Sequence, residues 1–142
     1  MCKCALCEEA SSLCDSHIIP KLIYNRTKSY RNSRFRNYNN LNEIFQDGEK
    51  KPLLCQSCEK FFCIFESEFA NKYLDLYLAK PKYLPEPFEN IDAYIISVSW
   101  RILFDDLYLL DSYDGIFREL FERLERDLRI SLINLKNEKL VG

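Results

Sequence analysis

Four cysteines in two equally spaced pairs are the residues with the clearest capacity for chemistry in this 142-residue chain. Two residues separate Cys4 from Cys7, and two separate Cys55 from Cys58. A short turn with this spacing points both thiolates at one metal ion, and two such pairs complete the tetrahedral coordination that structural zinc prefers. We therefore expect a structural zinc site on these four cysteines.

The chain holds three further cysteines, and it begins without the apolar leader of a secreted protein. Thiols stay reduced in the cytoplasm, so we expect a cytoplasmic protein whose cysteines bind metal rather than form disulfides. Cys2 or Cys14 could take the place of one of the four ligands. No apolar stretch reaches the roughly 20 residues that span a bilayer, and no membrane partner is expected.

The only histidine, His17, lies between the two cysteine pairs, in the run DSHIIP at residues 15–20. An imidazole with a pKa of about 6.5 can accept a proton at neutral pH, so His17 is a candidate general base. The alternative is a structural histidine that hydrogen-bonds to the backbone.

The segment that follows His17 is basic and rich in aromatic residues. Between residues 21 and 36 there are six basic residues and no acid: Lys21, Arg26, Lys28, Arg31, Arg34 and Arg36. Cations that pair with phosphates, together with rings that stack on bases, are typical of a nucleic-acid-binding surface. The alternative is a solvated loop. Residues 1–51 carry a formal charge of +3 and residues 52–142 carry −5, so positive charge lies in the part that holds the metal motif.

Two elements are expected to position these side chains. β-branched residues on both sides of Pro20 predict a strand over residues 15–24, and aromatic residues at three- and four-residue steps predict a helix from about residue 57 to about residue 78. Three prolines mark residues 80–89 as a linker. Helices are expected over about residues 91–110 and 111–137.

These elements predict an α+β protein in three parts. Residues 1–79 form a small zinc-binding domain, residues 80–89 a proline-rich linker, and residues 90–142 a two-helix region packed on or beside the domain. In the first of these two helices, Arg101, Asp105 and Asp106 are expected to mark the solvent-facing edge.

The last helix has one charged face and one apolar face. Its apolar positions are Phe117, Leu120, Phe121, Leu124, Leu128, Leu132 and Leu135. We expect this face to pack in the core. The alternative is a homo-oligomer or a protein partner bound through the same helix.

The order of the motifs resembles the zinc-stapled, four-cysteine branch of the HNH endonucleases, whose fold is a ββα-metal treble clef. The resemblance covers residues 4–70, and it is carried by CALC, SHIIPK and LCQSCE, the last of which opens a helix. SHIIPK, PLLCQSCEKFF and the run VSWR at residues 98–101 are also similar to a group of uncharacterised bacterial HNH-like proteins. The resemblance implies a treble-clef unit followed by a helical C-terminal region.

In that family the four cysteines hold structural zinc, and a separate Mg or Mn ion stabilises charge at the scissile phosphate. The resemblance implies that His17 is the general base, and that Asp15, Ser16 and Glu59 lie at or beside the positions that bind the catalytic metal. Ser16 stands where the family has a metal-binding aspartate or histidine. Lys50 stands near the place of the family asparagine.

Glu59 stands in the place of the last family histidine. Its carboxylate is a competent ligand for Mg or Mn, and the alternative is a solvated carboxylate at the start of the helix. Glu66 shares a helical face with Glu59 and could supply a second oxygen.

The expected function is therefore metal-dependent hydrolysis of phosphodiester bonds in nucleic acid, in DNA rather than RNA, with the basic segment gripping the phosphates. The alternative is a catalytically inactive, zinc-stabilised module that binds nucleic acid or another protein.

Overall fold

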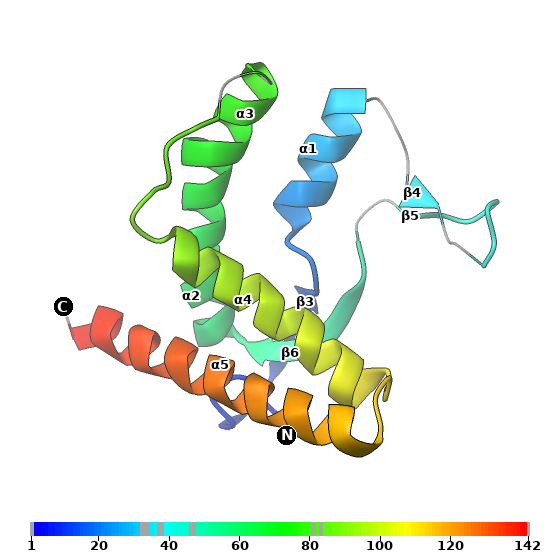
Figure 1. Ribbon diagram of the computed structural model, residues 1–142, viewed down its shortest axis with the longest axis vertical. Coiled ribbons are helices and arrows are strands. Elements are labelled where there is room, and N and C mark those ends of the chain that lie inside the picture. Colours follow the sequence, from blue (N-terminus) through cyan, green and yellow to red (C-terminus); the bar gives the residue numbers. More distant parts are fainter. Residues whose placement is uncertain are drawn as a thin grey trace.

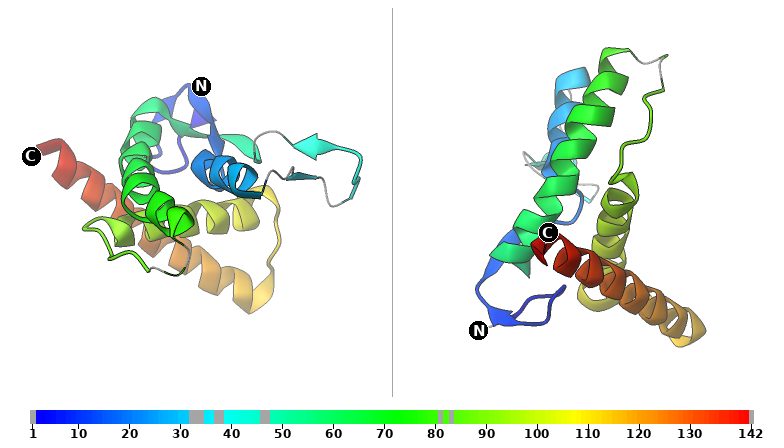
Figure 2. Two further views of the ribbon diagram at one scale, coloured as in Figure 1. Left: turned by 90° about the horizontal axis from the view of Figure 1, so that it is seen from above. Right: turned by 90° about the vertical axis from the view of Figure 1, so that its left-hand side faces the viewer.

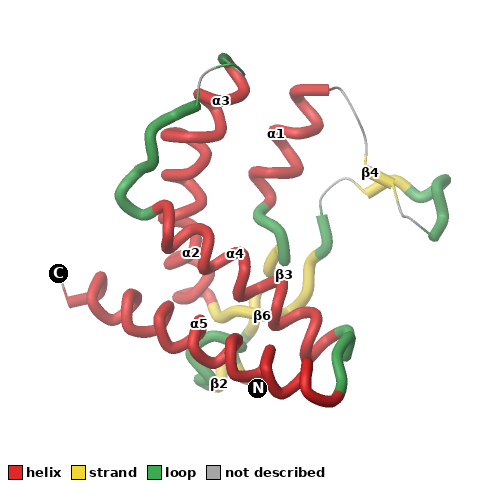
Figure 3. Tube along the Cα trace, in the orientation of Figure 1, coloured by secondary structure: helices red, strands yellow, loops and turns green. Residues whose placement is uncertain are grey.

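The computed structural model describes residues 2–31, 35–36, 39–45, 48–80, 82 and 84–141, with the side chains of residues 29–31, 35–36 and 44–45 outside the described part. All described strands lie within residues 2–55, and every described helix except the first follows them (Figures 1 and 3). The α+β class with a helical C-terminal region is thus confirmed.

The first cysteine pair lies in a turn between two short strands. Strands β1 (Cys2–Lys3) and β2 (Ala10–Ser11) pair antiparallel around it. The turn is closed by the backbone N–H of Glu8, which donates to the oxygen of Cys4 at 2.9 Å, with Glu8 in the left-handed conformation at φ 61°.

The central hairpin carries the second cysteine pair into a helix. Strand β3 (Leu13–His17) pairs antiparallel with β6 (Lys50–Cys55), with a bulge between Cys14 and Asp15. Helix α2 (Gln56–Phe69) begins directly after β6, so Cys58 falls in its first turn. The order of cysteine turn, β-hairpin and helix is that of the expected treble-clef unit.

The long helix predicted over residues 57–78 is confirmed. Helix α2 continues through a π-helical turn, η1 (Ala70–Leu74), into α3 (Asp75–Ala79). Of the expected linker, residues 81 and 83 lie outside the described part of the chain, and residues 84–88 are neither helix nor strand.

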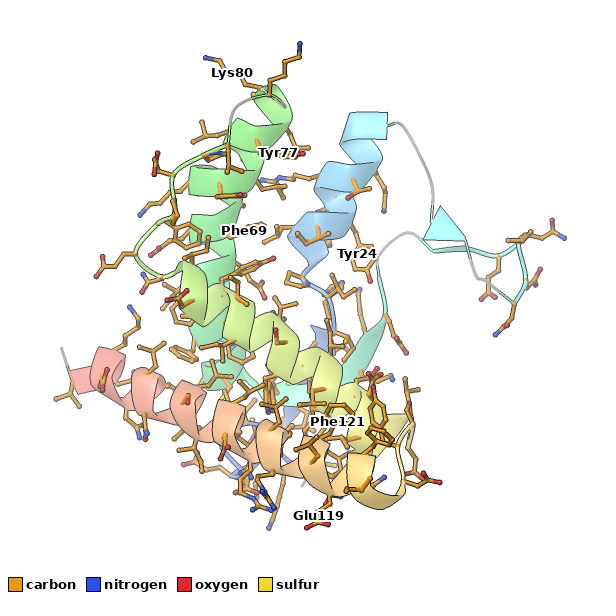
Figure 4. The ribbon with its side chains drawn as sticks, in the orientation of Figure 1. Tyr24, Phe69, Tyr77, Lys80, Glu119 and Phe121 are labelled. Carbon is orange, nitrogen blue, oxygen red and sulfur yellow. The ribbon has the colours of Figure 1, made fainter. Side chains whose placement is uncertain are left out.

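The expected strand over residues 15–24 is wrong in its second half. Strand β3 ends at His17, and Lys21–Arg31 form helix α1. Pro20 directly precedes the helix, and its carbonyl accepts a hydrogen bond from the N–H of Ile23 at 3.0 Å, which closes the first turn. Tyr24 lies on the side of α1 that faces the chain entering β6, where its ring packs over Gly48 (Figure 4).

Two further helices cross the base of α2 (Figures 1 and 2). Helix α4 (Ile91–Phe104) continues as the π-helical segment η2 (Asp105–Leu109), as predicted for residues 91–110. Helix α5 (Gly115–Val141) begins later and ends later than predicted. Two left-handed residues, Asp111 and Gly115, turn the chain between these helices.

One hydrophobic core joins the treble-clef unit to the C-terminal helices. Phe62 of α2 meets Trp100 of α4 edge to face at 6.0 Å, and Phe69 of α2 stacks on Tyr94 of α4 at 4.1 Å between ring centroids. The side chains of the strands, of α2 and of α4 therefore pack into one hydrophobic core.

The expected apolar face of α5 is only partly buried. Phe117, Leu120 and Leu124 are 63%, 55% and 45% exposed, whereas Glu125 and Lys136 are buried. In the first half of the helix, Arg118 lies over the ring of Tyr108 of η2, and Glu119 points away from the molecule (Figure 4). Glu125, near the middle of the helix, and Lys136, near its end, point inward because they hydrogen-bond to Trp100 and Cys58.

Candidate metal centre

The sulfur atoms of Cys4, Cys7, Cys55 and Cys58 all lie within 4.8 Å of one another. In the described part of the chain, this is the one group of three or more His, Cys, Asp or Glu ligand atoms that close together. The sulfurs of Cys7 and Cys55 are 3.8 Å apart. A tetrahedron with metal–sulfur distances of about 2.3 Å has edges of about 3.8 Å, so the donor set fits a zinc ion.

The chain positions the four sulfurs through backbone contacts. Ala5 N–H donates to the oxygen of Leu53 at 3.0 Å, which joins the first cysteine turn to β6. Cys55 N–H donates to the sulfur of Cys4 at 3.3 Å. Cys4, Cys55 and Cys58 are buried, and all four thiols are free of disulfides.

Ionisation within the group is strongly coupled. The Cys58 thiol donates a hydrogen bond to Cys4, which lowers the pKa of Cys4 to about 4 against the opposing effect of burial. The same hydrogen bond, together with burial, raises the pKa of Cys58, and burial raises the pKa of Cys7. Closely spaced thiolates repel one another, so a metal dication is what would stabilise all four together.

Helix α5 reaches the cysteine group with charged side chains. Lys136 Nζ donates to the sulfur of Cys58 at 3.1 Å, and Arg129 Nη1 lies 2.9 Å from Glu8 Oε2, next to Cys7. Burial would lower the pKa of Lys136, but the cysteine sulfurs raise it by more. Sequence reasoning missed both residues, although Lys136 follows the buried Leu132 by one helical turn.

Ser16 and Glu59 are in direct contact. Ser16 Oγ is buried and donates to Glu59 Oε2 at 2.7 Å, which joins β3 to the first turn of α2. Alternation along β3 places Asp15 and His17 on the opposite face of the strand from Ser16. Asp15 is exposed and His17 is half-buried, with its Nε2 atom shielded from solvent.

Arg101 ties this part of the hairpin to α4. Its Nη1 donates to the backbone oxygen of His17 at 3.2 Å, its Nη2 to Glu66 Oε1 at 2.7 Å, and its guanidinium lies over the ring of Phe62 at 5.0 Å. Burial raises the pKa of Glu66, and Arg101 opposes that shift. Arg101 was expected at the solvent edge but is 1% exposed.

Asp105 was also expected at the solvent edge and is 4% exposed. It forms an ion pair with Lys51 of β6, which also contacts Glu49 at 3.1 Å. Lys51 lies opposite Ser16 in the β3–β6 pair. Arg101 of α4 and Asp105 of η2 therefore both contact this strand pair next to Ser16.

The basic segment is divided between two faces of α1. Lys21 and Lys28 are seven positions apart and leave the helix on one side, whereas Arg26 leaves it on the other and binds Asp75 of α3, with Nε 3.1 Å from Oδ1. The side chains of Arg31 and Arg36, and all of Arg34, lie outside the described part.

No protein-family model, curated protein or solved structure matches this chain. Among the described helices, none combines the length and the apolar character needed to cross a membrane.

Proposed function

We propose that this chain is an HNH-like nucleic-acid-binding protein, built on one structural zinc ion and working in the reducing cytoplasm. The contact between Ser16 and Glu59 carries the proposal. In the family that the sequence resembles, these two positions supply ligands to one catalytic metal from a strand and from the helix after the fourth cysteine. In this chain the Ser16 hydroxyl donates a hydrogen bond to the Glu59 carboxylate, with Oγ and Oε2 2.7 Å apart.

The surface that binds the phosphates is the face of α1 that carries Lys21 and Lys28. This helix holds four basic residues and no acid, and the Tyr24 ring anchors it over Gly48. Lysines on one side of a helix can follow one nucleic-acid backbone, and DNA is the preferred ligand.

The test is the salt dependence of binding to a duplex DNA and to an RNA of the same sequence. In Lys21→Ala/Lys28→Ala, the log–log slope should flatten by roughly 2, because each lost phosphate contact removes about one unit. Arg123→Ala/Arg126→Ala removes two exposed cations from α5 and is the matched control. Equal slopes in both variants would overturn the assignment of this face.

Endonuclease activity is the second candidate function. His17 directly follows Ser16, and Arg101 holds its backbone oxygen. In a hydrolytic reaction, the imidazole would take the proton of the attacking water, and Glu59 with Ser16 would hold an Mg or Mn ion. Asp15, like His17, leaves β3 on the face opposite Ser16. That ion would supply charge stabilisation at the phosphate.

Cleavage of plasmid DNA and of labelled RNA with added Mg or Mn tests this candidate. Wild-type protein should cleave, and His17→Ala should lose the activity while keeping its zinc. If zinc-loaded protein binds nucleic acid but cleaves no substrate with either metal, the binding function stands and the hydrolytic one is withdrawn.

The exposed apolar side chains of α5 support a third proposal, in which a second copy or another protein docks there. Phe117, Leu120 and Leu124 occupy successive turns and are all exposed. Light scattering should then give a mass above that of the monomer, reduced by Leu124→Glu. A clean monomer before and after the substitution would count against it.

A further inference from the structure

Three polar residues share the inner face of α5 with the buried Leu132. Lys136 and Glu125 are 9% and 3% exposed, and Arg129 lies between them on the same side of the helix. A helix that served only to cover a core would place apolar side chains at all of these positions. The polar side chains are there because α5 packs against the Cys58 sulfur and the Glu8 carboxylate.

Lys136 makes the closest approach to that surface. Its ammonium donates to the Cys58 sulfur at 3.1 Å, and in the described part of the chain no carboxylate lies within ion-pairing distance of it. A buried ammonium is stable only with a partner of opposite charge. The Cys58 sulfur accepts this hydrogen bond, and it carries the opposite charge once a metal ion replaces its proton.

The contact between Lys136 and Cys58 would also affect how tightly a metal ion is bound. A dication held by four thiolates carries two excess negative charges, and the ammonium of Lys136 offsets one of them. Groups that hydrogen-bond to metal ligands fix their orientation, and their removal typically weakens metal binding by about 10- to 100-fold.

Arg129 holds the same helix over the other cysteine pair. Its Nε donates to Glu125 Oε1 at 3.2 Å, and its Nη1 pairs with Glu8, the residue after Cys7. Glu125 in turn accepts from Trp100 Nε1 at 2.9 Å. Through Arg129 and Lys136, α5 thus contacts the chain at both cysteine pairs.

We propose that Lys136 is a positioning residue of the metal centre. It holds the Cys58 thiolate and offsets charge, so that retention of the metal depends on the docking of α5. The proposal rests on the zinc occupancy proposed above and is independent of nucleic-acid binding.

The experiment measures zinc transfer to a chromogenic chelator from purified wild-type protein, Lys136→Met and Lys139→Met. Lys139 is the matched control, since it lies on the same helix, is exposed and approaches the Phe65 ring rather than a sulfur. Both lysines line a concavity of about 400 Å³ between α2 and the end of α5.

Lys136→Met should release zinc at least about tenfold faster than wild type, and Lys139→Met within about twofold of it. Lys136→Gln, which keeps an N–H donor without the charge, should fall between them. Equal release from wild type and Lys136→Met would overturn the proposal, as would a wild-type protein that takes up no metal.

A spectroscopic measurement separates this role from simple packing. In cobalt-loaded protein, the sulfur-to-metal charge-transfer band should shift in Lys136→Met and stay in place in Lys139→Met. If Lys136→Met does not fold, Lys136→Gln is compared with wild type in both measurements, and an unshifted band with unchanged release overturns the proposal.

Discussion

The guanidinium of Arg101 donates a hydrogen bond to the backbone oxygen of His17 at 3.2 Å, although the two residues are 84 positions apart in the chain. The same side chain is 1% exposed and forms an ion pair with Glu66 at 2.7 Å. A C-terminal helix therefore fixes the backbone at the candidate general base.

Replacing Arg101 with methionine should strongly destabilise the fold. It leaves Glu66 and the His17 carbonyl without their buried donor, and breaking a buried pair costs about 3–5 kcal/mol. Urea denaturation measures the loss. Arg123→Met is the control, because Arg123 is 68% exposed and should change stability by less than about 0.5 kcal/mol. Similar effects of both substitutions would contradict the structural role of Arg101.

Metal content should follow the four cysteines. Protein purified without added metal should hold about one zinc ion per chain, and Cys55→Ser should lose both the zinc and most of the thermal stability. Cys63 is exposed and outside the group, so Cys63→Ser should keep the metal. Metal analysis measures the zinc content, and thermal unfolding measures the stability. A folded wild-type protein free of metal would refute this prediction.

The Ser16–Glu59 hydrogen bond should contribute to stability. Ser16→Ala removes the donor to a carboxylate, and we expect a loss of about 1–3 kcal/mol in the free energy of unfolding. A double-mutant cycle with Glu59→Gln isolates the interaction, and Ser99→Ala, at an exposed position of α4, is the control. Additive effects of Ser16→Ala and Glu59→Gln would show that the two side chains do not interact in solution.

Stability should fall at alkaline pH because of Tyr94. Burial raises the pKa of its phenol to about 12, compared with about 10 in an unfolded chain. The unfolded chain therefore releases a proton that the folded chain keeps, so this contribution is complete below about pH 10 and is lost as the pH rises to about 12. Its size is about 2–3 kcal/mol.

Denaturation of wild type and Tyr94→Phe across this pH range measures the contribution. Tyr94→Phe keeps the ring that stacks on Phe69 but removes the titrating group. The variant should therefore lose less stability than wild type between these pH values. Parallel pH profiles for the two proteins would contradict the prediction.

Gly48→Ala should displace α1. A Cβ at this position would lie 1.8 Å from Cε2 of Tyr24, so the ring must move, and overpacking of this kind costs about 1–3 kcal/mol. In a Tyr24→Ala background the same change should cost much less, because the ring is absent. Thermal unfolding of the four proteins tests this, and an equal cost in both backgrounds would locate the strain elsewhere.

Local rules in the sequence were enough for the scaffold. The two-residue gap within each cysteine pair is set by turn geometry, and the helices at residues 56–79 and 91–109 follow from apolar periodicity, so both could be predicted without knowledge of the fold. The α+β class and the clustering of the four cysteines followed from those patterns. Helix α1 was not predicted, because the β-branched residues around Pro20 favour a strand, whereas the chain after Pro20 forms a helix.

Tertiary structure decided the surroundings of the candidate site. Arg101, Asp105 and Lys136 are residues that usually face solvent, yet all three are buried here. Each is stabilised by a partner more than 30 positions away, respectively Glu66, Lys51 and Cys58. Helical periodicity assigns a charged residue to the surface unless such a partner is known, and only the folded chain brings those partners within hydrogen-bonding distance.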